Sequence, residues 1–403
     1  MSELLTQIKS SIDDTTAAVK GFRADVDALR DRIEAIEAKG MSPGRASTPA
    51  HKATPTDAIT VDGELVPILR KGSDFRAYYA KPADAEDLEG LTFADFVRGV
   101  AKMKTSAAAT KALSVGTGTA GGYAVPTVIM PGILEALTPA STVLQAGAGI
   151  VDVSGRDGKA FNWAAVDTIP TAAWRSEAGA VSESDPAFRE VATTPRSLSF
   201  YFKVSRELLA DAGNMDAALR QAISQAFAKE LDRTALRGSG SAPEPRGILN
   251  TTNVGAVTNG GTGATQSSQR WSKLLEAYST ILAYDAPAPT AAIMAPRSLV
   301  GYNSLADTTN QPLQRPNLLA NLPFLATSQI PVNLNVGGST DCTEVYVGDF
   351  SKVMIVMREA PTIALANELF ALNGQVGFVC NVRADIAVTY PRAFAVVTGI
   401  RAG

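Results

Sequence analysis

Residues 194–250 constrain the fold of this chain most, because they join a strict strand pattern to one long helix. Over residues 197–204, apolar side chains alternate with polar ones or tyrosine, which predicts a strand with one buried face. From about Met215 to Arg237, apolar residues recur every three or four positions, which predicts an amphipathic helix. Asn214 can cap the start of this helix and Gly238 can end it. The stripe consists of Met215, Leu219, Ala222, Ile223, Ala226, Phe227 and Leu231.

Three short runs of residues along the chain resemble motifs of one protein family. After the helix, residues 238–250 read Gly-Ser-Gly-Ser-Ala-Pro-Glu-Pro-Arg-Gly-Ile-Leu-Asn, which predicts a loop. Residues 121–126 read Gly-Gly-Tyr-Ala-Val-Pro, and residues 383–394 contain Arg-Ala-Asp-Ile-Ala-Val and Pro-Arg-Ala-Phe. Together they resemble the major capsid proteins of tailed phages of the HK97 type, over roughly residue 112 to the C-terminus. The resemblance implies an α+β fold with a long spine helix, an extended β-hairpin arm (the E-loop), and peripheral and axial domains.

Residues 1–40 carry an uninterrupted heptad pattern, which predicts a self-associating coiled coil about 50 Å long at 1.5 Å per residue. A single amphipathic helix packed on its own domain is the alternative. The seam residues are Leu5, Ile8, Ile12, Val19, Phe22, Val26, Leu29, Ile33 and Ile36, with Thr15 as the polar exception. The resemblance implies that this coiled coil acts as an internal scaffold segment.

Residues 41–111 are predicted to form a Pro-rich linker and the helical remainder of the scaffold segment. In the family, such a segment is often cut away after assembly by a prohead protease. The resemblance places the cut near Lys111 and Ala112.

Residues 150–193 contain little helical pattern, and alternation over 159–163 and 171–174 predicts a two-stranded arm. Because an isolated hairpin is marginal in water, we expect this arm to lie on a neighbouring copy of the chain. The expected contact residues are Lys159, Trp163, Trp174, Arg175, Glu177 and Glu183. Alternatively, both tryptophans belong to the chain's own core.

The remaining ranges complete the predicted shell domain. Residues 112–149 form its N-terminal arm, 194–266 the peripheral domain with the spine helix, 267–365 an axial α/β domain, and 366–403 the return strands of the peripheral domain. Strands are predicted over 290–294, 329–332, 343–347, 353–357, 376–382 and 384–388, and helices over 270–283 and 297–305.

The composition of the chain argues against several classes of function. The net charge of −3 and the lack of a dense Lys/Arg run argue against strong phosphate-driven binding, so contact with packaged DNA should be non-specific. Two cysteines cannot build a disulfide framework, and Cys380 in its apolar run is expected to be buried. The sequence shows neither a membrane span nor a secretory signal.

No catalytic, cofactor-binding or metal site is predicted. Residues 116–121 match G-x-G-x-x-G, but Val125-Pro126 follows where a phosphate-binding helix should open. The only histidine, His51, lies in the Pro-rich linker, so a histidine-based catalytic constellation or a zinc site is excluded. A carboxylate-based hydrolase is a distant alternative. Some shells of this family cross-link through a Lys–Asn bond promoted by Glu. Val181, Gly374 and Asn381 occupy those three positions, so no cross-link is expected.

We therefore expect a major capsid protein that assembles through pentamers and hexamers into an icosahedral phage head around double-stranded DNA. It would assemble in the host cytoplasm and reside in the virion. A prohead protease, a portal and decoration or head-completion proteins are the expected partners. An encapsulin-like shell or a gene-transfer-agent shell shares the same fold and is the alternative.

Overall fold

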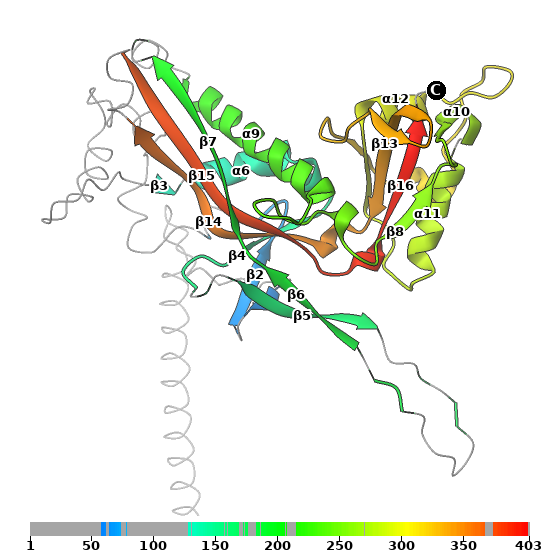
Figure 1. The fold of residues 1–403 in the computed structure, drawn as a ribbon, viewed down its shortest axis with the longest axis horizontal. Coiled ribbons are helices and arrows are strands. Elements are labelled where there is room, and N and C mark those ends of the chain that lie inside the picture. Colours follow the sequence, from blue (N-terminus) through cyan, green and yellow to red (C-terminus); the bar gives the residue numbers. More distant parts are fainter. Residues whose placement is uncertain are drawn as a thin grey trace, which may run out of the picture. The chain divides into compact units, whose positions relative to one another are not determined.

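In the computed structural model, the described residues are 58–61, 64–73, 78, 128–129, 131–156, 158, 160–168, 172, 174–175, 183–185, 187–205, 207, 215–269, 271–366 and 374–401. All of them belong to one unit, residues 57–403. Two seven-stranded sheets and a two-stranded hairpin organise this unit (Figure 1).

The first sheet has the strand order β1-β2-β4-β14-β15-β7, and β3 pairs with β14 off this path. Its strands are β1 (Ala58–Val61), β2 (Glu64–Leu69), β3 (Val128–Ile129), β4 (Gly149–Asp152), β7 (Arg196–Ser205), β14 (Val353–Ala366) and β15 (Gln375–Val388). β15 is one continuous strand, whereas the sequence predicts two. Arg383 interrupts the apolar run but not the strand, because its backbone still pairs with Ser197 and Glu359.

The strand and helix predicted from local periodicity are confirmed. In β7 the side chains of Ser197, Ser199, Tyr201 and Lys203 are exposed, while the alternate positions are covered. The spine helix α9 (Met215–Arg237) has the predicted bounds and lies along β7 and β15 (Figure 1). Phe227 of α9 meets Phe200 of β7 edge to face, with ring centroids 5.0 Å apart. The buried stripe is offset from the predicted one, because Ser224 and Ala228 are buried while Ala222 and Ala226 are exposed.

The second sheet has the order β11-β10-β13-β16-β8, with β12 beside β13 and β9 beside β16. Its strands are β8 (Gly255–Thr258), β9 (Ala264–Thr265), β10 (Ala291–Met294), β11 (Phe324–Ala326), β12 (Leu334–Val336), β13 (Ser339–Gly348) and β16 (Phe394–Arg401). The accompanying helices are α10 (Gln266–Gln269), α11 (Ser272–Leu282), α12 (Pro296–Asn303) and α13 (Asn317–Ala320). The strand predicted over 329–332 is absent, and β11 and β12 lie on either side of that range.

The two sheets exchange strands across the predicted domain boundaries. β14, expected in the axial domain, belongs to the first sheet, while β8, β9 and β16 belong to the second. The crossings are the 3₁₀ turns η2 (Phe350–Lys352) and η4 (Pro391–Ala393). The backbone N–H of Asp349, the residue before η2, donates to the carbonyl oxygen of Ala393 in η4 at 3.0 Å. Phe350 and Phe394 meet edge to face at this junction. The boundaries predicted at residues 266 and 365 therefore do not coincide with the division between the two sheets.

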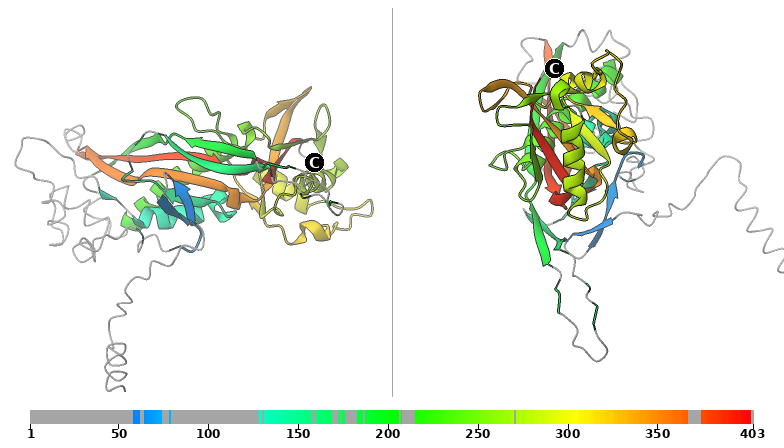
Figure 2. Two further views of the ribbon diagram at one scale, coloured as in Figure 1. Left: turned by 90° about the horizontal axis from the view of Figure 1, so that it is seen from below. Right: turned by 90° about the vertical axis from the view of Figure 1, so that its right-hand side faces the viewer.

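The N-terminal part of the first sheet also departs from the prediction. Within the segment predicted as linker and scaffold helix, β1 and β2 form an antiparallel hairpin, and β2 pairs with β4. Val61, Val66 and Leu69 are buried, and each contributes on the order of 1.5–3 kcal/mol by that burial. Figure 2 shows the hairpin (blue) from two further directions. The coiled-coil seam and the position Lys111–Ala112 lie outside the described residues.

Helices α6 (Pro131–Ala140) and α7 (Thr142–Gln145) pack beside α9, and η1 (Ile248–Asn250) follows the loop after it. The main core combines both sheets with these helices. A smaller core lies where β1, β2 and β4 meet the hairpin arm.

Candidate functional site

The hairpin arm consists of β5 (Phe161–Thr168) and β6 (Ala187–Thr193), which pair antiparallel with Phe161 opposite Thr193. Both strands extend away from the first sheet (Figures 1 and 2). The predicted two-stranded arm is thus present, but its second strand is not 171–174. Residues 172, 174 and 175 lie outside any strand, and β6 supplies the partner of β5.

The arm presents large side chains to solvent. Trp174 is 105% exposed and Phe188 is 66% exposed. Arg175 and Glu183 are exposed as well. An exposed tryptophan on an extended segment is typical of a surface that another molecule covers. Lys159 and Glu177 lie outside the described residues.

Trp163 has a different place from Trp174. Its side chain is only 6% exposed and packs with Phe161, Val151 and Val191 in the smaller core at the root of the arm. The expectation that Trp163 contacts a neighbouring copy therefore needs correction. The β5 alternation turns Phe161 and Trp163 to the inner face, so this tryptophan fixes the arm to its own chain.

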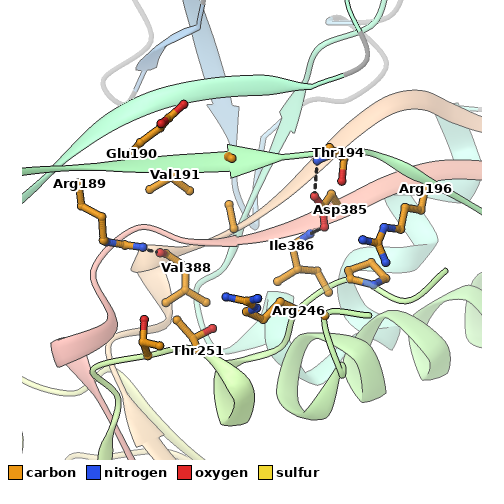
Figure 3. Close-up of a pocket in the computed structure, with 15 residues that line it drawn as sticks. Arg189, Glu190, Val191, Thr194, Arg196, Arg246, Thr251, Asp385, Ile386 and Val388 are labelled. Carbon is orange, nitrogen blue, oxygen red and sulfur yellow. Dashed lines mark hydrogen bonds between the residues drawn. The ribbon is translucent and has the colours of Figure 1, made fainter. Parts of the chain in front are cut away.

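A pocket of about 340 Å³ lies beside the arm root (Figure 3). It is lined by β6, β7, β15 and the loop after α9, and the charged side chains of the lining include Arg189, Arg196, Arg246 and Asp385. Arg189 donates hydrogen bonds to the carbonyl oxygens of Val388 and Thr389, both at 3.0 Å. Arg196 donates to the carbonyl oxygen of Glu244. The Arg189 bonds tie the arm to the end of β15, and the Arg196 bond ties β7 to the loop after the spine helix.

Asp385 fixes the turn between β6 and β7. Its carboxylate accepts the backbone N–H of Thr194 at 2.6 Å and that of Ile386 at 2.8 Å. Burial raises the pKa of Asp385, and the two hydrogen bonds oppose this shift. Figure 3 shows Thr194 and Asp385 bonded to each other at one side of the pocket.

Three arginines and two acidic residues, Glu190 and Asp385, line the pocket, so basic residues exceed acidic ones by one. Three arginines can hold an anionic group such as a carboxylate, but the lining contains no cysteine, histidine or lysine. Within the described part of the chain, no group of three or more His, Cys, Asp or Glu residues could hold a metal ion. Burial raises the pKa of the Cys380 thiol to about 12, which keeps it protonated and unreactive.

The loop after the spine helix is built on two glycines in contact. Gly247 N donates to Gly238 O at 2.9 Å, and Asn250 Nδ2 donates to the same oxygen at 2.8 Å. A Cβ on Gly247 would overlap the backbone of Gly238 and Thr234. Residues 245–250, Pro-Arg-Gly-Ile-Leu-Asn, therefore hold the end of α9 in place.

The positions that carry cross-linking in some shells do not hold the required chemistry. Gly374 has a left-handed backbone with φ 62°, and Asn381 lies within β15 opposite Ser199 and Thr362. Val181 lies outside the described residues.

Sequence reasoning missed two features. The pocket arginines lie on separate elements, and no local pattern links them. The β1–β2 hairpin could have been predicted from the sequence. The dipeptide Asp62-Gly63 is typical of two-residue hairpin loops, and it stands between two short apolar runs.

Comparisons with known proteins decide the family. The phage capsid family matches residues 121–399. The chain belongs to the phage capsid family. Its fold is HK97-like: the capsid of an empty GTA particle, computed with C5 symmetry, matches with a TM-score of 0.52 at 16% identity, over 74% of this chain and 99% of that one. Mycobacterium phage Adephagia gives 0.48 at 14% identity, over 73% and 97%.

A virus-like particle from Pyrococcus furiosus gives a TM-score of 0.45 at 14% identity, over 66% of this chain and 96% of that one. No curated protein matches the chain in sequence. As a major capsid protein, the chain is a structural component of a virion shell, and that shell is built from copies of the chain. None of the described helices combines the length and apolar character that crossing a membrane requires.

Proposed function

We propose that this capsid protein assembles through pentamers and hexamers into an icosahedral head that encloses double-stranded DNA. The arm carries this proposal. It leaves its own body with Trp174 and Phe188 exposed, and a two-stranded hairpin gains little stability alone in water. A neighbouring copy would cover these side chains and order the arm.

The geometry of such contacts favours rings. An arm that lies on the next copy makes a heterologous contact, and heterologous contacts close into rings when the rotation permits. Each contact can be weak enough for misplaced subunits to leave, while several contacts per subunit stabilise the closed shell.

In this proposal the coiled coil predicted for residues 1–40 acts as a scaffold. It would raise the local concentration of shell domains during assembly in the host cytoplasm and then be removed by a prohead protease. A portal and decoration or head-completion proteins would complete the head, and DNA would contact the shell without sequence preference. The net charge of −3 agrees with weak DNA contact.

Negative-stain microscopy tests the proposal. The protein expressed alone, and together with a prohead protease, should form closed particles, and nuclease-protected DNA in particles from lysed host cells would mark a DNA-packaging head. Deletion of residues 1–56 should give aberrant particles or none. A monomer that never associates, or normal shells from the deleted chain, would contradict the assembly and the scaffold parts respectively.

A further inference from the structure

The outer edge of β4 is occupied by the β1–β2 hairpin. Ile68 and Leu69 of β2 pair with Val151 and Ile150 of β4, and the other side of β4 pairs with β14. An unoccupied edge would present a row of unpaired backbone groups, which proteins generally cover. The hairpin therefore completes the first sheet.

The shape of the β4 edge is complementary to the β1–β2 hairpin. Gly149 stands at the start of β4, and a Cβ there would lie well under 3.0 Å from Ile68 Cγ2. Glycine at this position thus makes room for the isoleucine of the hairpin. Such close approach is a common reason for glycine within a strand.

Two arginines hold the hairpin at its ends. Arg70, which follows β2, donates to the carbonyl oxygens of Gly147 at 2.6 Å and Ser351 at 3.3 Å. Arg156, in the shell body, donates to Val61 O at 2.6 Å. These bonds join the hairpin to three separate stretches of the body.

The hairpin also covers the core that anchors the arm. Val61 and Val66 are buried at 0% and 3% exposure in the cluster that contains Phe161 and Trp163. Loss of the hairpin would expose the apolar side chains at the arm root. If assembly depends on the position of the arm, the hairpin must stay in place after the scaffold is removed.

We propose that the edge of β4 is a strand-binding site whose permanent occupant is residues 58–73 of the same polypeptide, retained when the scaffold is trimmed. The inference rests on the proposed shell function. A single cut at Lys111–Ala112 would leave the scaffold tethered through the hairpin. Release of the scaffold therefore requires a cut before Ala58, and the segment lost is at most residues 1–57.

A native digestion tests this. The full-length chain receives one recognition sequence for a site-specific protease after Thr56 and a second after Lys111. After digestion and size-exclusion chromatography without denaturant, fragment 57–111 should elute with fragment 112–403 in equimolar amount, and should separate only in denaturant. If fragment 57–111 elutes alone, the proposal is overturned.

Matched variants test the assigned contact. Gly149→Ala in the doubly cleavable chain should crowd Ile68 and release a larger fraction of fragment 57–111. Gly149→Ala with Ile68→Ala should restore part of the retention, because the smaller side chain leaves room for the new methyl group. Equal retention in all three chains would show that the hairpin is held elsewhere, which also overturns the proposal.

The digestion needs only soluble, folded subunits, so it can be read even when no particles form. Absence of particles would count against the proposed shell function alone. Particles whose subunits lack peptides from residues 58–73, by mass spectrometry after denaturation, would count against this inference alone.

Discussion

Asp232, on the spine helix, is a polar group on which the packing of two helices depends. Its carboxylate accepts hydrogen bonds from Ser141 Oγ at 2.6 Å, Thr142 N at 2.8 Å and Val143 N at 3.2 Å. Ser141 in turn accepts the N–H of Leu144 as the N-cap of α7. The long helix thus satisfies the free N–H groups of a short one.

Replacement of Asp232 should therefore weaken the folded subunit. Asp232→Ala leaves the partly buried N–H of Thr142 and the buried N–H of Val143 without this acceptor, at a cost of about 2–3 kcal/mol in the free energy of unfolding. Asp232→Asn keeps one acceptor oxygen and should cost less. Denaturant unfolding of unassembled subunits measures both, and equal stability of Asp232→Ala and the parent chain would contradict this role.

The contribution of Asp232 to the stability of the subunit depends on pH, and the direction of this dependence follows from its pKa. Burial raises the pKa of Asp232 above its ordinary 3.8, with the hydrogen bonds opposing. Because the folded state then holds the proton more tightly than the unfolded state, this group's contribution is full below pH 3.8 and is lost as pH rises through the folded-state pKa. The stability of the parent chain relative to Asp232→Asn should fall over that window. A rise there would contradict the shift.

The two tryptophans of the arm should respond differently to truncation. Trp163→Ala removes a buried ring and should cost about 3–5 kcal/mol in subunit stability. Trp174→Ala removes an exposed ring, so the isolated subunit should unfold as before while assembly is impaired. Denaturant unfolding and particle yield by light scattering measure the two effects. Normal particle yield from Trp174→Ala would argue against Trp174 as a contact.

At the scale of elements, the confirmed predictions of a strand and a long helix rest on local periodicity in the sequence. The alternation of β7 and the three-and-four spacing of α9 depend on nearby residues, so the sequence predicts both. Sheet membership depends on distant partners. β14 follows β13 after only residues 349–352, yet its pairing with β15 and β4 places it in the other sheet. The pocket was unpredictable for the same reason.

The joint between the arm and the first sheet allows an element-scale prediction. Arg189→Met removes the two hydrogen bonds to the β15 end, so the arm should hold its direction less firmly and assembly should slow several-fold. Arg246→Met is the matched control, because the Arg246 side chain makes no hydrogen bond with the residues described here. Stopped-flow light scattering compares them. Equal slowing would assign the effect to pocket charge instead.

At the scale of the whole molecule, the shell should be held together without covalent bonds. The positions used for cross-linking in some shells carry Val181, Gly374 and Asn381 here, none of which supplies the Lys, Asn or Glu needed at its place. Mature particles boiled in denaturant should therefore run as single chains on a gel. A ladder of higher bands would contradict this prediction.

The described unit leaves Trp174 and Phe188 of the arm uncovered and closes the β4 edge of its first sheet with its own hairpin, which suits a subunit built to bind copies of itself. Cryo-electron microscopy of the purified full-length protein tests this most directly. We predict closed shells in which Trp174 of every copy is covered by the adjacent copy. Dispersed monomers at high protein concentration, with the arm folded against its own body, would contradict the account.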